Sequence, residues 1–131
     1  MGEFGTMRIP AARTAIAPDG SDVRVLLELK RGGMAHFELA PGQVSTAVTH
    51  RTVEEIWVFI SGRGEMWRRQ GQREEVVTVE VGVCLTIPVG THFQFRSFGD
   101  EALAAIAVTM PPWPGEGEAT VVQGQWQPTL P

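Results

Sequence analysis

Hydrophobic residues alternate with polar ones in short runs along most of the chain, and no run shows the 3.6-residue period of a helix. Alternation of this kind predicts β-strands that bury one face. Small groups of Gly and Pro separate the runs, which is typical of strands closed into a barrel or a sandwich. The expected strands of this all-β fold cover residues 22–30, 34–40, 44–50, 55–60, 65–70, 74–80, 82–87, 92–97 and 102–109.

The two ends of the chain lack this alternation. We expect residues 1–6 to be an expression scar and residues 7–21 to form an irregular N-terminal arm. Residues 22–110 are expected to form the barrel, and residues 111–131 an irregular Trp-bearing tail. The tail begins Pro-Pro-Trp-Pro-Gly and cannot join a central strand, because proline has no N–H to donate to a neighbouring strand. Trp113 and Trp126 are the expected anchors of the tail, since each can bury a large apolar surface.

Composition narrows the class of protein. The 131 residues are 43% hydrophobic and 20% charged, which predicts one folded domain. A single cysteine, Cys84, excludes an internal disulfide and a thiolate-rich zinc site, and three histidines leave few ways to build a histidine-based metal site. The net charge is −4 without a cluster of basic residues, so we expect no nucleic-acid partner. Without a long apolar run or a signal peptide, we expect no membrane partner and a cytoplasmic location.

Two spaced motifs stand out. The first places Gly42, Val48, His50, Glu55 and Gly62 with five residues before Val48, four between His50 and Glu55, and six before Gly62. The second runs from Gly82 over five residues to Pro88-Val89-Gly90-Thr91-His92-Phe93, with Ser97 four positions further on.

Together the two motifs resemble those of the cupin superfamily, in particular its small single-domain bacterial members. The resemblance covers residues 22–110 and implies a small jelly-roll barrel of two antiparallel sheets. It also implies a homodimer, since small cupins of this kind usually share edge strands. The arm and the tail are then expected to cover the sheet edges.

The resemblance implies a divalent metal inside the barrel, and here the chain departs from the pattern. In the family, two histidines and a glutamate of the first motif and a histidine of the second bind the metal. His50 and Glu55 match two of these positions, whereas Val48 and Phe93 occupy the other two and Ser97 replaces an asparagine. We therefore expect no metal, or a weakly held Fe, Mn, Ni or Zn. An alternative remains open, in which a one-residue slip turns His92 inward and completes a metal site of His50, Glu55 and His92.

Strand alternation indicates which side chains face the interior. The predicted cavity wall consists of Thr46, Val48, His50, Glu55, Trp57, Phe59, Phe93 and Phe95. His50 and Glu55 are the candidate catalytic residues, because an imidazole and a carboxyl group in an apolar barrel can act as general acid and base. The other six are candidate ligand-binding residues. By the same alternation His92 faces away from the cavity, and His36 is expected to face solvent or another subunit.

Three functions follow from this site. The first is a small-molecule-binding cupin with proton-transfer chemistry, of isomerase or lyase type, on a small carbonyl, carboxylate or sugar-like ligand. The second is a metal-dependent enzyme, dioxygenase-like or isomerase-like, that uses His50, Glu55 and His92. The third is a non-catalytic ligand sensor or carrier. The missing metal ligands favour the first or the third over the second.

Overall fold

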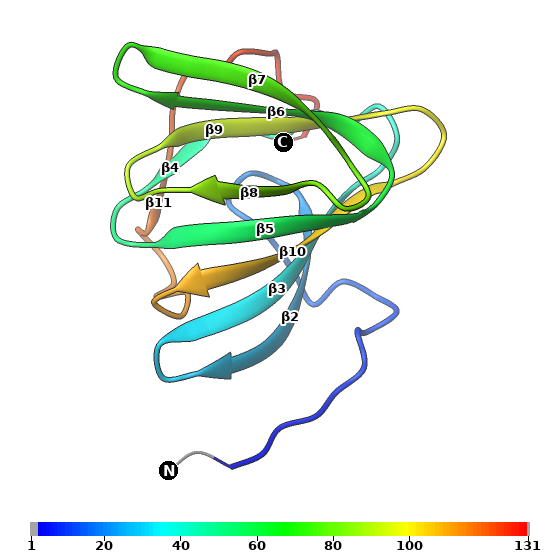
Figure 1. Cartoon of the computed structure of the whole chain (residues 1–131), viewed down its shortest axis with the longest axis vertical. Coiled ribbons are helices and arrows are strands. Elements are labelled where there is room, and N and C mark those ends of the chain that lie inside the picture. The colour runs from blue at the N-terminus through cyan, green and yellow to red at the C-terminus, as the bar shows by residue number, and fades with distance from the viewer. Residues whose placement is uncertain (1–2, 131) are drawn as a thin grey trace.

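Two antiparallel β-sheets pack face to face and form a short barrel (Figure 1). The structure, a computed structural model, describes residues 3–130, and within that range it contains strands and no helix. The all-β fold of two antiparallel sheets that the alternation and the resemblance predict is therefore confirmed. Met1 and Gly2 of the expected scar, and Pro131 at the end of the expected tail, lie outside the described residues.

In each sheet, some strands that are far apart in the sequence lie side by side. The six-stranded sheet has the order β1-β2-β3-β10-β5-β8, from Ala15–Ile16, Asp22–Leu29, Gly32–Leu39, Leu103–Met110, Glu54–Ser61 and Cys84–Ile87. The five-stranded sheet has the order β11-β4-β9-β6-β7, from Ala119–Val121, Val48–His50, His92–Phe98, Arg63–Gln70 and Arg73–Glu80. The β5–β6 turn needs Gly62, because its φ of 74° is left-handed and a Cβ there would collide with the backbone of Ala102.

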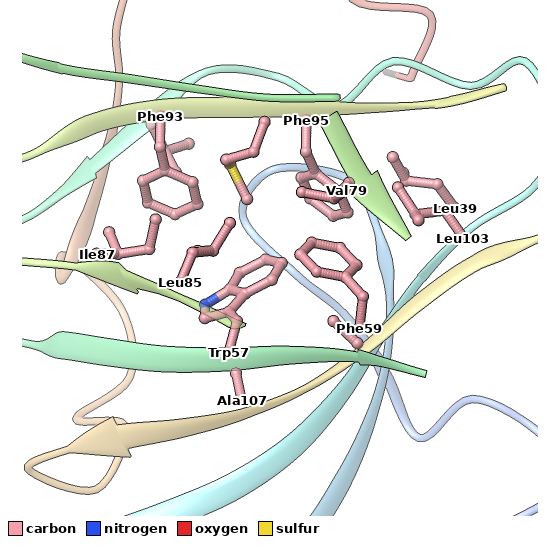
Figure 2. Packing of buried hydrophobic residues seen from close by; sticks show 13 residues of the cluster. Leu39, Trp57, Phe59, Val79, Leu85, Ile87, Phe93, Phe95, Leu103 and Ala107 are labelled. Carbon is pink, nitrogen blue, oxygen red and sulfur yellow. The ribbon is translucent and has the colours of Figure 1, made fainter. Parts of the chain in front are cut away.

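The hydrophobic core fills the space between the sheets (Figure 2). Its largest fully buried side chains include Trp57 and Phe59 from β5 and Phe95 from β9. Trp57 stacks on Phe37 and meets the edges of Phe93 and Phe95 at ring distances of 6.2 and 5.2 Å. Each aromatic ring buries a large apolar area, so these contacts hold the two sheets together and fix the orientation of β5.

Two short strands appear in segments without strand alternation in the sequence. β1 pairs with the start of β2, and β11 pairs with β4, opposite the residues from Val48 to His50. The tail is held further by Gln94, a fully buried side chain that donates to the carbonyls of Ser45 and Trp126 and accepts from two tail N–H groups. The guanidinium of Arg96 lies 4.2 Å from the ring of Trp126. The tail is thus docked along the five-stranded sheet.

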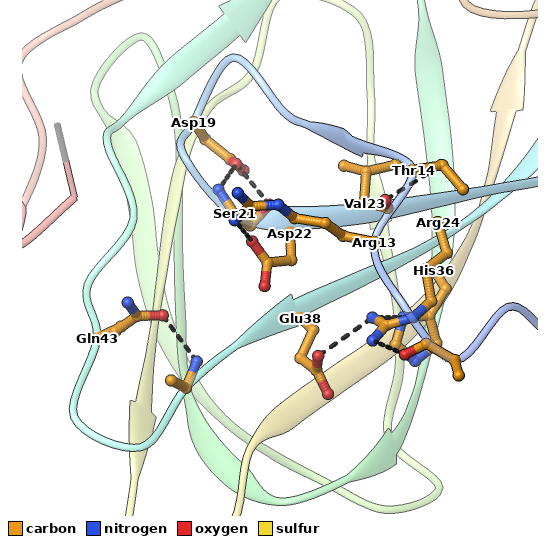
Figure 3. Close-up of polar contacts among 12 residues, drawn as sticks. Arg13, Thr14, Asp19, Ser21, Asp22, Val23, Arg24, His36, Glu38 and Gln43 are labelled. Atoms are coloured by element: carbon orange, nitrogen blue, oxygen red, sulfur yellow. Dashed lines mark hydrogen bonds and ion pairs between the residues drawn. The ribbon is translucent and has the colours of Figure 1, made fainter.

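The N-terminal arm is joined to the barrel by polar contacts (Figure 3). Arg24 on β2 donates to the carbonyls of Pro10 and Ala11 and forms an ion pair with Glu38 at 3.1 Å. Its guanidinium also lies 3.4 Å from Nδ1 of His36. His36 is only 7% exposed beneath this group, which differs from the solvated position that its strand face suggested. Burial and the positive charge of Arg24 lower the pKa of His36.

The outer face of the six-stranded sheet exposes several apolar side chains. Ile56 and Ile60 on β5 are 50% and 41% exposed, and Val108 on β10 lies opposite Ile56 in the register. An apolar sheet face of this kind favours association with another protein surface. The homodimer expected from the sequence, in which the subunits share edge strands, stays a prediction. In the part of the chain described, no helix has the length and apolar character needed to cross a membrane.

Candidate functional site

A cavity of about 170 Å³ lies inside the barrel, where β2 and β3 approach β4 and β5. A cavity of roughly 150 Å³ lined by apolar side chains can hold one benzene-sized molecule. Most of the wall here is aliphatic or aromatic, and the polar atoms come from a few side chains. This composition is typical of small-molecule sites, in which an apolar wall binds the body of the ligand and a few polar groups orient it.

The structure brings five of the predicted site residues to this cavity. Val48, His50, Glu55, Trp57 and Phe93 all line it, and each is at most 7% exposed. Their positions follow from the strand register, because Val48 on β4 lies opposite Phe93 on β9 and alternate residues of β5 face inward. The alternation in the sequence therefore indicated the correct face of three strands at the site.

Three predicted ligand-binding residues do not line the cavity. Phe59 and Phe95 point inward but are packed into the core beyond the cavity, at 1% and 0% exposure (Figure 2). Thr46 is only partly buried and lies before β4 begins at Val48. The alternation does not extend back to Thr46, because Ala47 and Val48 are both buried in succession and the pairing with β9 before β4 is irregular, with an isolated bridge at Val44.

The imidazole of His50 and the carboxyl group of Glu55 face each other without a hydrogen bond. Nδ1 of His50 lies 3.9 Å from Oε1 of Glu55, beyond hydrogen-bond distance. This Nδ1 atom is buried and has no hydrogen-bond partner among the residues that the structure describes. The His50 ring is held edge-on by Phe93 and Trp113, at ring distances of 5.3 and 5.0 Å. A rigidly held, buried and unpaired nitrogen is the feature of this cavity that most clearly requires a partner.

Burial shifts the pKa values of the two candidate catalytic groups in opposite directions. Desolvation raises the pKa of Glu55 to about 8, although a hydrogen bond from Nε1 of Trp57 opposes this and the nearby Asp19 adds to it. Desolvation lowers the pKa of His50, while the negative charge of Glu118 works against that shift. Near neutral pH the carboxyl group therefore keeps its proton and the imidazole is uncharged. An acid that holds a proton beside a base that can take one is the arrangement needed for proton transfer.

Several residues of the site were missed in the sequence. Asp19, from the loop after β1, lines the cavity at 5% exposure, and burial raises the pKa of its carboxyl group. Thr109 on β10 and Trp113 in the tail also line the cavity. Trp113 was expected only as an anchor, and no spacing pattern connects Asp19 with the two motifs.

Glu118 in the tail fixes the loop between the two candidate catalytic residues. Its carboxylate accepts hydrogen bonds from the N–H and hydroxyl of Thr52 and from the N–H of Val53, at 2.6 to 2.9 Å. Its own carbonyl accepts from the N–H of Arg51. Burial alone would raise the pKa of Glu118, but these hydrogen bonds lower it below the usual value. Residues 51–53 join β4, which ends at His50, to β5, which carries Glu55, so Glu118 positions both.

Replacing Glu118 with Gln is expected to lower the free energy of unfolding by about 2 kcal/mol at pH 7, because charge-assisted hydrogen bonds to a buried carboxylate are lost. A carboxyl group with a lowered pKa stabilises the fold above its unfolded pKa, and this contribution is lost as the pH falls through the folded value. The difference from the unmodified protein should therefore shrink in acid. Urea denaturation at pH 7 and at pH 3 measures both effects. Glu116→Gln, an exposed change in the same tail, is the control and should have little effect.

The third candidate metal ligand is not brought to the other two. His92 lies on β9 opposite Arg69, next to the inward-facing Phe93, so its side chain lies on the other face of the sheet. No one-residue slip occurs there. Among residues 3–130, no group of three or more His, Cys, Asp or Glu side chains is placed to hold a metal ion. One imidazole and one carboxyl group provide too few ligands for the metal site that the resemblance implies, so the donor set does not fit that cofactor.

Comparison with models of known protein families identifies the family of this chain. A family model described as "Cupin domain" matches residues 35–109, which is more than half of the chain. Comparison with the curated proteins finds no match.

Solved structures show the same fold at low sequence identity. A protein with a double-stranded β-helix domain from Klebsiella pneumoniae aligns with a TM-score of 0.71 and 18% identity, over 93% of this chain and 100% of that one. The capsular polysaccharide assembling protein CapF from Staphylococcus aureus aligns with a TM-score of 0.68 and 18% identity, over 84% of this chain and 34% of its own length. Oxalate decarboxylase from Bacillus subtilis, which has Mn(II) centres, aligns with a TM-score of 0.69 and 17% identity, over 82% of this chain and 29% of its own. At such identities the likeness concerns the fold alone.

Proposed function

Because the chain belongs to the cupin domain family, we propose that its barrel binds a small organic molecule and that His50 and Glu55 transfer protons to and from it. The observation that carries this proposal is the unpaired Nδ1 atom of His50, buried in the wall of a cavity of about 170 Å³. A buried polar atom without a partner is costly, and a ligand with a hydrogen-bonding group would supply the missing partner.

The lining of the cavity favours one of the ligand classes expected from the sequence. A carboxylate ligand would need a basic partner, and neither Lys nor Arg is among the described residues that line the cavity. A sugar-like ligand would need many hydrogen-bond partners, whereas this wall is mainly apolar. A small carbonyl compound with an apolar body fits best, because it needs only one or two polar contacts.

The acid–base pair suits proton transfer next to a carbonyl group. In the proposed step the uncharged imidazole of His50 takes a proton from the carbon beside the carbonyl, while the carboxyl group of Glu55 donates its proton to the carbonyl oxygen. The C–H bond breaks, an enol forms, and the reverse transfers return both protons to the product. The proposal uses protein groups alone, in agreement with a donor set that does not fit the metal site of the family.

The ketone 1-phenylpropan-2-one, which has an apolar ring and exchangeable α-hydrogens, tests this proposal. In D₂O at pH 7 we expect the protein to speed the exchange of its α-hydrogens, measured by NMR, and His50→Ala and Glu55→Gln each to slow that exchange by about 100-fold. Ala35→Leu, which fills part of the cavity, should weaken binding of the ketone, whereas Ala12→Leu in the exposed arm should not. Equal exchange in all five proteins would contradict the proton-transfer proposal, and binding unaffected by Ala35→Leu would contradict the cavity as the site.

A further inference from the structure

We propose that the cavity selects a ligand that carries a positively charged amine, in preference to neutral or anionic molecules of the same shape. This inference rests on the proposed function, because the same cavity has to admit a small organic molecule. It adds the charge of the ligand, which neither the fold nor the acid–base pair specifies.

Apart from His50, the ionisable side chains around the cavity are all acidic. Asp19, Glu28 and Glu55 line it, and no Lys or Arg is among the lining residues in the described part of the chain. The side chains of Asp19 and Glu55 are 5% and 2% exposed, so solvent does little to screen them. Within residues 3–130 neither carboxyl group has a Lys or Arg partner at salt-bridge distance. A buried carboxyl group without a cation is expensive to ionise, and a cationic ligand would remove that cost.

The unpaired nitrogen of His50 is an independent sign of a hydrogen-bond donor in this place. His50 is 7% exposed, lines the cavity, and leaves Nδ1 without a partner. Nδ1 and Oε1 of Glu55 are 3.9 Å apart. One ammonium nitrogen placed between them could donate an N–H to each at about 2.8 Å, because an ammonium group has donors and no acceptor. A carboxylate in the same position would face a second carboxyl group.

Aromatic rings complete the surroundings of this position. Trp57, Phe93 and Trp113 line the cavity close to His50 and Glu55, and Trp57 is stacked on Phe37. The faces of such rings are electron-rich and attract ammonium groups, most strongly when water is excluded. The same rings bind the apolar body of a ligand, so an amine with an aromatic or aliphatic body would use both the carboxyl groups and the wall.

Three probes with one ring and three charges test the inference: benzylamine as its ammonium ion, neutral benzyl alcohol, and benzoate. Their dissociation constants are measured at pH 7 and 150 mM salt by chemical-shift titration, which also locates binding at the cavity residues. We expect benzylamine to bind about tenfold more tightly than benzyl alcohol, and benzoate more weakly than either. Glu55→Gln, or independently Asp19→Asn, should reduce the ratio of the affinity for benzylamine to the affinity for benzyl alcohol about threefold or more. Glu54→Gln, an exposed change on the same strand, should keep the full preference.

The outcomes separate the two proposals. If benzyl alcohol or benzoate binds in the cavity as tightly as benzylamine, the preference for a cation is wrong and the small-molecule site stands. If the preference falls equally in Glu54→Gln, it reflects the net charge of the surface, and the inference is again overturned. If none of the three probes shifts the cavity residues, the proposed binding function fails together with the inference.

Discussion

Replacing Glu55 with Gln is expected to stabilise the protein at pH 7 and above, by on the order of 3 kcal/mol, and to change its stability little at pH 4. The reason is the pKa of about 8 that desolvation gives this carboxyl group. Gln has a similar shape and keeps an oxygen that can accept the hydrogen bond from Trp57, but it has no charge to bury. A loss of binding or exchange activity should accompany the gain in stability.

The sign of this effect follows from proton binding in the two states. Below about pH 4.5 the carboxyl group is protonated in the folded and the unfolded chain, so it contributes no pH dependence. Between about 4.5 and 8 the unfolded chain loses the proton while the folded protein keeps it, and stability falls as the pH rises. Above about pH 8 both states are ionised and the loss levels off. The Gln variant lacks this titration, so the two stability curves diverge across that range.

Urea denaturation of the two proteins from pH 4 to pH 9 measures the divergence directly. Glu54→Gln, one position earlier on β5 and exposed, is the matched control and should follow the unmodified protein at every pH. Parallel curves for Glu55→Gln and the unmodified protein would show that Glu55 titrates normally, and the proposed general acid would then be unprotonated at neutral pH. A residue that destabilises its own fold is expected at a site retained for function.

Introducing two histidines is expected to create a metal site in the cavity, where residues 3–130 provide no donor set that fits one. Val48 and Phe93 lie opposite each other across β4 and β9, and both line the cavity beside His50 and Glu55. The double variant Val48→His, Phe93→His places three imidazoles and one carboxyl group around one point. Without metal it should be less stable than the unmodified protein, because replacing a buried Phe costs about 2–4 kcal/mol.

Zn²⁺ or Mn²⁺ at about 100 times its dissociation constant should then stabilise the double variant by roughly 3 kcal/mol, or on the order of 10 °C in melting temperature. The unmodified protein should show no comparable shift, and its melting temperature should not change with a chelator. Adding Glu55→Gln to the double variant removes a ligand and should abolish most of the gain. A similar metal-dependent shift in the unmodified protein would contradict our assignment of the site as one that works without metal.

The strands were largely predictable because alternation is a local property of the sequence. β5 shows this best: residues 55–60 were expected and Glu54–Ser61 was found, with Trp57 and Glu55 on the inner face as predicted. The prediction for Thr46 was wrong in its assignment to the cavity. Ala47 interrupts the alternation because it is buried, and its carbonyl accepts a hydrogen bond from Val122 in the tail, far away in sequence. Phe59 and Phe95 face inward as expected, but the alternation does not tell how far along the barrel the cavity extends.

The groups that tune the site were not predictable in the same way. Asp19 and Glu118 reach the neighbourhood of Glu55 and His50 through loops and hydrogen bonds between distant parts of the chain, such as the 2.7 Å bond from Thr52 to Glu118. No periodicity encodes such contacts. The sequence did show that histidine is scarce. In the structure His92 lies on the face of β9 that points away from the cavity, so it does not join His50 at the site.

Segments from both ends of the chain line the cavity: the loop with Asp19 before β2, and Trp113 after β10. This arrangement has a consequence for synthesis on the ribosome, where the chain emerges from its N-terminus at about 5–20 residues per second. The barrel strands leave the ribosome before the tail, and until Trp113 and Glu118 arrive His50 has neither its covering ring nor its fixed loop. The strands of the barrel can therefore begin to pair before the binding site is complete, and the nascent chain should acquire the ability to bind ligand only after Trp113 and Glu118 have docked.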